Sequence, residues 1–152
     1  IAKERGIADA SYNLAYANSW SDIALGKQMS ESMIDDGADV VFAYANELGL
    51  GVINGAIEKG VKAVGYSSDQ TVIDPTTVVA SVDFDYATMY VWAINEWLEG
   101  KLKGNQMIEV GVPEDIYFPV YTENCPQEAK DACDAAVKAL KEGSVDLKAL
   151  FD

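Results

Sequence analysis

Four short polar segments carry the side chains most capable of chemistry in this sequence, and each follows an apolar run. The candidate site residues comprise three aromatic rings, two amides, a hydroxyl and a carboxylate. They are Trp20, Tyr44, Phe84, Asn46, Gln70, Ser67 and Asp69. Aromatic rings stack on flat ligands, whereas amides and carboxylates hydrogen-bond the hydroxyl and amino groups of a solute. These residue types predict reversible binding of a small hydroxylated or heteroaromatic molecule.

The composition gives little support to catalysis. The 152 residues contain no histidine, which removes histidine-based triads, histidine metal sites and the commonest general base near neutral pH. Asp83 and Asp85 would share one face of an extended segment, but two aspartates are few ligands for a cation. Solvation or contact with a second lobe is the favoured explanation for this pair. We therefore expect a binding protein with no enzymatic activity, no metal and no cofactor.

One glycine-rich segment supports an alternative function. Gly49-Leu50-Gly51 is predicted to form a turn that opens a helix. Together with Gly55 it resembles a loosened dinucleotide fingerprint, and Asp69 lies downstream. It would make the protein an NAD(P)-dependent enzyme that holds the pyrophosphate at a helix N-terminus. Against this, Glu47 would lie next to the phosphates. Close helix–sheet packing is the favoured explanation of the glycines, and N–H donation to a neutral ligand is another.

Charge and cysteine content narrow the range of partners. With 25 acidic and 11 basic residues the net charge is −14, which opposes binding to nucleic acid or to anionic lipid.

The two cysteines, Cys125 and Cys133, would lie about 12 Å apart along a shared helix, too far for a disulfide. A bridge would require Cys125 to fold back, so paired and free thiols both stay open. Ile1–Arg5 is typical of a helix interior, so we expect a mature protein or a fragment.

The elements that must position the candidate residues alternate between strand and helix. Apolar runs at 12–17, 39–45, 62–66 and 77–82 predict four parallel strands, and a helix capped by Ser21 or Asp22 follows the first. Such alternation predicts an α/β fold with a doubly wound parallel sheet and right-handed crossovers. Ligands bind beyond the carboxyl ends of the strands in these sheets. The topology therefore predicts that all the candidate residues meet at one edge.

We expect two parts in the chain. Residues 1–104 form an α/β ligand-binding lobe, and the helix at 87–98 has so wide an apolar face that it must pack on a sheet or a second body. Residues 105–152 provide short crossover strands at 108–112 and 117–121 and a helix from about 126 to 143. This second part packs on the same lobe or on a lobe that is missing here.

Several blocks within residues 10–104 follow one another in a familiar order. They are Asn18-Ser19-Trp20-Ser21-Asp22 with Gly26-Lys27, Gly37-Ala38-Asp39-Val40-Val41-Phe42, Gly49-Leu50-Gly51-Val52, Gly65-Tyr66-Ser67-Ser68-Asp69-Gln70, Val78-Val79-Ala80-Ser81-Val82 and Leu98-Glu99-Gly100-Lys101. The series resembles the basic membrane protein family of ABC-transporter substrate-binding lipoproteins, which includes purine nucleoside receptors. The blocks lie at nearly the spacing of that family.

The resemblance implies one lobe of a type I periplasmic-binding-protein fold. It implies that two lobes close on a nucleoside-like ligand, which is then delivered to an ABC permease, and that the N-terminal lobe is missing from this chain. It also implies an extracytoplasmic location, in the periplasm or lipid-anchored at the outer face of the cell membrane. A ligand-sensing domain of a transcription regulator shares this fold and is a further alternative.

The sequence departs from the family at three places that the family uses largely to grip a ribose. Asn46-Glu47-Leu48 replaces Gly-Gly-Thr, Ser67 replaces the first aspartate of D-x-D-Q, and Phe84 replaces a lysine. A purine nucleoside is therefore the leading ligand, while a nucleobase or another small aromatic or polyhydroxy solute stays open.

Overall fold

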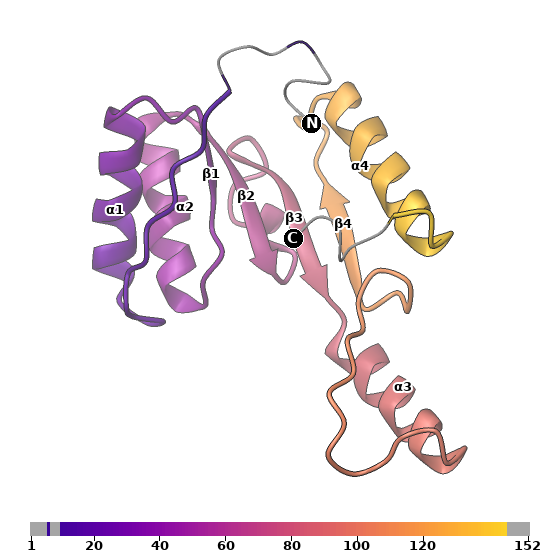
Figure 1. Ribbon diagram of the computed structural model, residues 1–152. Helices are drawn as coiled ribbons and strands as arrows, with labels where there is room; N and C mark the ends of the chain where they lie inside the picture. The colour runs from indigo at the N-terminus through magenta and orange to yellow at the C-terminus, as the bar shows by residue number, and fades with distance from the viewer. Residues whose placement is uncertain (1–5, 7–9, 146–152) are drawn as a thin grey trace.

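The computed structural model describes residue 6 and residues 10–145, which form a mixed α/β fold as predicted; Ile1–Arg5 lies outside the described residues. The elements in chain order are α1 (Ile23–Asp35), β1 (Val40–Phe42), α2 (Glu47–Lys59), β2 (Lys62–Ser67), a 3-10 turn η1 (Gln70–Val72), β3 (Val78–Phe84), α3 (Tyr86–Leu98), β4 (Tyr117–Tyr121) and α4 (Gln127–Lys141) (Figure 1).

The four strands form one mainly parallel sheet in the order β1-β2-β3-β4. β1, β2 and β3 run parallel, with Val40 beside Lys62 and Ser67 beside Asp83, whereas β4 pairs with β3 in the antiparallel sense. The carboxyl ends of β1, β2 and β3 therefore lie at one edge of the sheet. Because β4 runs the opposite way, its first residue, Tyr117, comes to the same edge and pairs with Phe84.

The core lies between the sheet and α2. It is built by alternate residues of the strands and by the inward face of α2, namely Val41, Ala43, Ile53, Ala56, Ala63 and Val78. Strand residues at period two share a face, so Val41 and Ala63 point to α2 while Val40 and Phe42 point to the opposite side. On that opposite side Val40 and Phe42 stay about half exposed.

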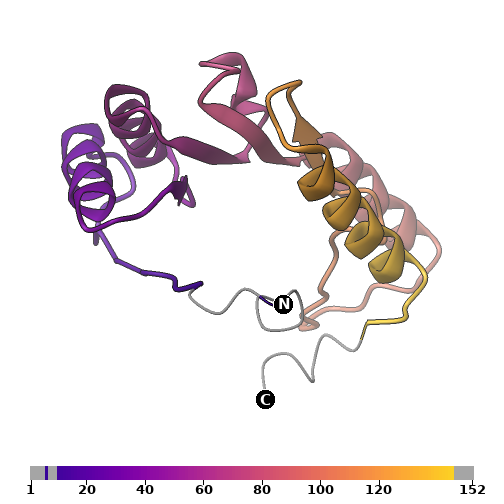
Figure 2. The same cartoon turned by 90° about the horizontal axis from the view of Figure 1, so that it is seen from above.

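α1 packs directly on α2, and glycines make the close approach possible (Figures 1 and 2). A Cβ atom at Gly51 would overlap the carbonyl oxygen of Ile23, and one at Gly26 would overlap the carbonyl oxygen of Leu48. The Ser30 hydroxyl crosses the contact and donates to the Val52 carbonyl over 3.0 Å.

The glycine segment is therefore helix rather than turn. α2 begins at Glu47, so Gly49, Gly51 and Gly55 all lie inside it, and the predicted turn at 49–51 is wrong. Asn46 occupies the N-cap position, three residues before Gly49, although its side chain makes no capping hydrogen bond. Close helix packing accounts for Gly51 and Gly55.

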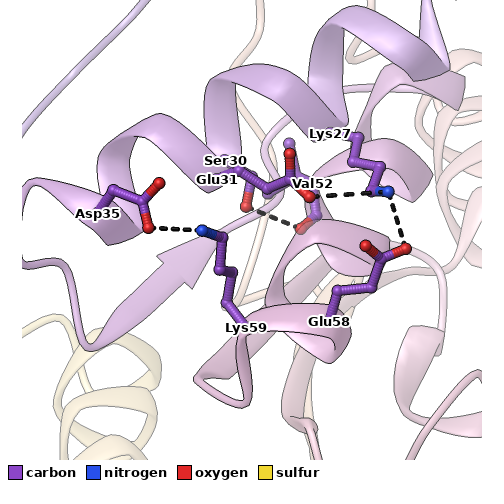
Figure 3. A network of polar contacts seen from close by, with 7 residues as sticks. All are labelled: Lys27, Ser30, Glu31, Asp35, Val52, Glu58 and Lys59. Atoms are coloured by element: carbon purple, nitrogen blue, oxygen red, sulfur yellow. Dashed lines mark hydrogen bonds and ion pairs between the residues drawn. The ribbon is translucent and has the colours of Figure 1, made fainter.

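Two exposed ion pairs cross the outer side of the same helix pair (Figure 3). The Lys27 ammonium lies 2.7 Å from the Glu58 carboxylate, and the Lys59 ammonium lies 2.5 Å from Asp35. Each partner carboxylate raises the pKa of its lysine, chiefly through the hydrogen bond. Solvent screens the attraction within exposed pairs of this kind, so they add little to stability. The close packing at the buried glycines is therefore the main contact that holds α1 against α2.

Two predicted strands do not form. Residues 12–17 pair with no described strand, and Tyr12, Leu14 and Tyr16 are largely exposed. Residues 108–112 also lie outside the sheet. Gly111 instead accepts hydrogen bonds from the backbone of Ile116 and Tyr117, which uses its carbonyl in a local turn.

α3 projects beyond the sheet (Figure 1). Only Asp85 separates it from β3, so the helix continues away from the strand and does not fold back over it. None of its residues is buried, and its apolar side chains are more than half exposed at Tyr90, Val91, Ile94, Trp97 and Leu98. The predicted packing partner of this helix is not among the described residues.

α4 lies beside β4, and Tyr121 donates a hydrogen bond of 3.0 Å to Asp134. Between α4 and the open face of the sheet lies an apolar groove of about 390 Å³, whose lining includes Val64, Val82, Cys125 and Cys133. Both cysteines are free thiols. None of the described helices has the length and apolar character needed to cross a bilayer.

Candidate functional site

A pocket of about 280 Å³ lies at the predicted edge of the sheet, between the ends of β1 and β2 and the start of α2. Three of the predicted site residues, Asn46, Ser67 and Gln70, line it. The full lining is Ala45, Asn46, Glu47, Leu50, Tyr66, Ser67, Ser68 and Gln70. The parallel strands thus bring side chains from two distant segments to one place.

Asn46 is an uncommitted polar group in this pocket. It occupies the N-cap position of α2, yet its side chain makes no capping hydrogen bond and is exposed. The amide therefore has both a donor and an acceptor free for a ligand. The N–H of Leu48 is already taken, because it donates to the Trp20 carbonyl over 3.0 Å.

The start of α2 does not suit a dinucleotide. Glu47 places a carboxylate in the first turn, where a phosphate would need to lie. The glycines that would cradle the phosphate are inside the helix, and Gly49 and Gly51 are buried. The residues present do not fit a pyrophosphate-binding loop, which removes the structural basis of the dinucleotide alternative.

Ser67 ends β2 in an uncommon backbone conformation. Its φ of 73° lies in the left-handed region, which a residue with a Cβ seldom adopts. Its hydroxyl lies 3.3 Å from the Tyr86 hydroxyl at the start of α3. Strained residues of this kind occur often at ligand sites. Ser67 therefore connects the pocket to the first turn of α3.

Asp69 and Gln70 are committed to the folding of the loop after β2. Asp69 accepts hydrogen bonds from both the backbone N–H and the hydroxyl of Thr71. Gln70 is buried, and its side-chain oxygen accepts a hydrogen bond of 3.0 Å from the Tyr66 N–H. Gln70 reaches the pocket wall, whereas Asp69 is not among the residues that line it.

Two aromatic clusters flank Ser67 on either side. The first joins Phe42, Tyr44 and Tyr66, with the two tyrosine rings 4.4 Å apart. The second joins Phe84 to Tyr86 at 4.0 Å and to Tyr117 at 4.6 Å. Both clusters offer ring faces at the same edge of the sheet, which suits a flat ligand.

The pKa values of two phenols at this edge, Tyr44 and Tyr66, are raised. A hydrogen bond with Tyr66 is the main cause that raises the pKa of Tyr44, and burial is the main cause that raises the pKa of Tyr66. Neutral phenols keep both a donor and an acceptor, so they can hydrogen-bond either kind of ligand group.

Trp20 and the aspartate pair lie apart from the pocket lining. The Trp20 ring is 67% exposed, and only its backbone carbonyl is engaged, by Leu48. Asp85 caps α3 by accepting from the N–H of Thr88, which lowers the pKa of this aspartate. Asp83 accepts from the N–H of Phe84. Each aspartate thus has a local structural partner.

Sequence reasoning missed four residues of this region. The sequence places Tyr66 in a strand, Leu50 next to the predicted glycine turn and Tyr117 in a crossover strand, and it does not single out Tyr86. Successive side chains of β2 point to opposite faces of the sheet, so Tyr66 points away from the face on which Gly65 is buried. This alternation is the sequence signal for Tyr66. No sequence signal locates Tyr117, since its position depends on the antiparallel direction of β4.

Comparison with known proteins gives the family. A family model described as ABC transporter substrate-binding protein PnrA-like matches residues 8–142. Basic membrane protein D of Borreliella burgdorferi (strain JD1) is 29% identical over 126 residues, which cover 81% of this chain and 37% of that protein. A purine-binding protein of Brucella abortus (strain 2308) is 24% identical over 137 residues, covering 90% and 38% respectively.

Solved structures share the fold. A solute-binding protein of an ABC transporter system from Aeropyrum pernix K1 matches with a TM-score of 0.76 at 16% identity, covering 95% of this chain and 49% of that one. A transcriptional activator of the comK gene from Bacillus halodurans matches with a TM-score of 0.75 at 17% identity, covering 87% and 47%. The chain spans less than half the length of each of these four proteins. Because the family model matches most of its residues, the chain belongs to the PnrA-like family of ABC-transporter substrate-binding proteins.

Proposed function

We propose that the protein is the extracytoplasmic solute-binding component of an ABC importer, and that it holds a nucleoside-like molecule at the carboxyl edge of its sheet. The observation that carries this proposal is the pocket between β1 and β2, whose lining includes the uncommitted Asn46 amide together with Ser67 and Tyr66. Such a pocket offers amide, hydroxyl and carboxylate groups that can hydrogen-bond a ligand. Trp20, Tyr44, Asp69 and Phe84 remain proposed contacts around it.

The charges of the pocket favour a neutral ligand over a phosphorylated one. Glu47 is the one ionisable acid among the lining residues, and none of them is basic. A phosphate would meet a carboxylate in place of a counterion, whereas amino and hydroxyl groups can donate to Glu47 and Asn46. The name of the Brucella relative, a purine-binding protein, supports a purine base or nucleoside as the class.

The pocket needs a second wall, and we propose that another lobe of a longer protein supplies it. Asn46, Glu47, Leu50 and Ser68 are exposed on its outer side. A neutral hydrogen bond contributes about 1 kcal/mol, and stacking about as much, whereas micromolar affinity needs about 8 kcal/mol. One wall falls short of that total. Closure of a second lobe about a hinge would supply the remaining contacts.

α3 is the element that we expect the second lobe to cover. Its apolar stripe, from Tyr90 to Leu98, is exposed on a helix that carries a single charged residue, Glu96. A helix so apolar on all sides is stable only when it is buried. We therefore propose that residues 10–85 and β4, which completes their sheet, belong to the ligand-binding lobe, and that α3 contacts the other lobe.

The proposal is tested by titration calorimetry of the whole protein with adenosine, inosine, hypoxanthine and adenosine monophosphate. We expect one site of micromolar or tighter affinity for at least one of the three neutral compounds, and at least tenfold weaker binding of the monophosphate, because Glu47 repels it. Binding of NADH in preference to the neutral compounds, or no heat with any purine, would overturn the proposal.

A second candidate is the ligand-sensing part of a transcription regulator. The observation that favours it is the similarity in fold to the comK activator from Bacillus halodurans. Cell fractionation separates the two functions. An importer component is recovered outside the cytoplasm, whereas a regulator is recovered in the cytoplasm and binds DNA through a further domain.

A further inference from the structure

Three aspartates lie at the carboxyl edge of the sheet, and each serves the fold. Asp69 accepts hydrogen bonds from the N–H and the hydroxyl of Thr71. Asp83 accepts from the N–H of the residue that follows it over 2.8 Å, and Asp85 caps α3. None of the three is among the residues that line the pocket. The carboxylates best suited to bind neighbouring hydroxyls of a sugar therefore lie outside the pocket lining.

The Ser67 hydroxyl at the end of β2 already has a neighbour. It lies 3.3 Å from the Tyr86 hydroxyl, at the point where β2 and β3 end side by side and α3 begins (Figure 1). The Tyr86 ring packs on Phe84 with the ring centroids 4.0 Å apart, and the Tyr117 ring lies 4.6 Å from Phe84. Aromatic side chains thus border Ser67 toward β3 and β4, and they present ring surface where a sugar would need hydrogen-bonding groups.

Two consecutive polar side chains line the pocket at the start of α2. The Asn46 side chain makes no capping hydrogen bond, and Glu47 is the acid of the first turn. A carboxamide donates and accepts at once, which matches the edge of a purine that carries an amino or lactam group beside a ring nitrogen. A carboxylate only accepts, so Glu47 calls for an N–H or O–H donor on the ligand.

A free purine base and its nucleoside differ in the donor that they can offer to Glu47. The base carries an N–H on the ring nitrogen to which a sugar would be attached, and such a donor forms a charge-assisted hydrogen bond with a carboxylate. Glycosylation removes that hydrogen and adds neighbouring hydroxyls. Buried hydroxyls without partners carry a penalty in free energy, and the pocket lining holds no aspartate to receive them.

We propose that the ligand of this pocket is a free purine base, which the Asn46 amide recognises at one edge and which donates its ring N–H to the Glu47 carboxylate. A sugar on that nitrogen weakens binding. The inference rests on the proposed function, because it names the substrate class of the same site. It makes Glu47 the residue that distinguishes a base from its nucleoside.

Titration calorimetry of the whole protein with two matched pairs, adenine with adenosine and hypoxanthine with inosine, tests this inference. We expect at least one base to bind at least about tenfold more tightly than its nucleoside, because the nucleoside lacks the hydrogen bond to Glu47. A smaller preference in both pairs, or tighter binding of the nucleosides, would overturn the inference and leave the proposed function standing. Absence of binding in both pairs would overturn both.

Substitution of Glu47 separates the N–H contact from the bulk of the sugar. Glu47→Ala should weaken binding of the preferred base at least about fivefold and change binding of its nucleoside by less than about twofold. Glu128→Ala is the matched control, since Glu128 is likewise the acid in the first turn of a helix, α4, and lies outside the pocket lining. The control should leave both affinities unchanged. An unaltered ratio of base to nucleoside affinity in Glu47→Ala would refute the inference.

Discussion

Asn46 and Asp69 show how two polar residues that follow strands take different roles. The Asn46 side chain caps nothing and lines the pocket. Asp69 binds both polar groups of Thr71 and fixes the loop that carries Gln70. A ligand can reach the first without competing for any hydrogen bond, whereas binding to the second would compete with the fold. The candidate site therefore combines the uncommitted amide of Asn46 with a loop that Asp69 and Thr71 already hold in place.

We predict that Asn46→Ala weakens ligand binding and leaves the fold intact. Loss of one neutral hydrogen bond, about 1 kcal/mol, corresponds to roughly fivefold weaker affinity. Calorimetric titration of the whole protein measures the affinity, and urea denaturation measures the free energy of unfolding.

Asp69→Ala is the matched comparison for that variant. It should lower the urea midpoint, because the loop loses its two hydrogen bonds to Thr71. If Asn46→Ala bound as tightly as the unaltered protein while remaining folded, Asn46 would not be a ligand contact.

The residues that sequence reasoning located are those whose position depends on strand direction alone. Asn46 follows β1 and Ser67 ends β2, and the parallel direction of these strands brings both residues to the same pocket. Tyr117 could not be placed in this way. It depends on β4 running antiparallel, which no local pattern in the sequence encodes. The role of Asp69 also depends on a local turn that the sequence only suggests.

At the scale of elements, the pair α1 and α2 is held by an interface that tolerates no side chain at certain positions. Gly26 and Gly51 each face a backbone carbonyl of the opposite helix. Since backbone cannot move as a side-chain end can, an added methyl group must push the helices apart. This contact fixes α2, which begins at Glu47 directly after Asn46, and so it fixes one wall of the pocket.

We predict that Gly51→Ala destabilises the protein by about 1–3 kcal/mol or more, the usual cost of overpacking a tight contact. Gly104→Ala is the control, because a Cβ at Gly104 meets nothing within 4 Å. Thermal unfolding followed by circular dichroism measures both. Equal melting temperatures for Gly51→Ala and the unaltered protein would show that α1 and α2 are not packed as closely as described.

Element prediction worked where an element has its own stop and start signals. Asp22 caps α1 as expected, Gly60 ends α2 in the left-handed conformation, and the apolar runs at 39–45, 62–66 and 77–82 contain most of β1, β2 and β3. Residues 12–17 have the alternation of a strand but no described neighbour, and a strand exists only through its partner. Residues 108–112 do not pair in the sheet. The Gly111 carbonyl instead accepts hydrogen bonds from the backbone of Ile116 and Tyr117 in a local turn.

At the scale of the whole molecule, the described chain is open on three sides. β1 has a free edge, the sheet has an uncovered face at Val40 and Phe42, and α3 has an apolar stripe without a partner. The chain also spans less than half of the related proteins it matches. These features agree with one lobe of a two-lobed receptor, in which the carboxyl edge of the sheet faces the other lobe.

The most direct test of the binding site is the change in amide exchange of the whole protein when adenosine or hypoxanthine is added. The account predicts slower exchange at residues 45–50 and 66–70, which surround the pocket, with no change along residues 119–133 beside the apolar groove. Protection confined to residues 119–133, or unchanged exchange at 45–50 under saturating ligand, would contradict it.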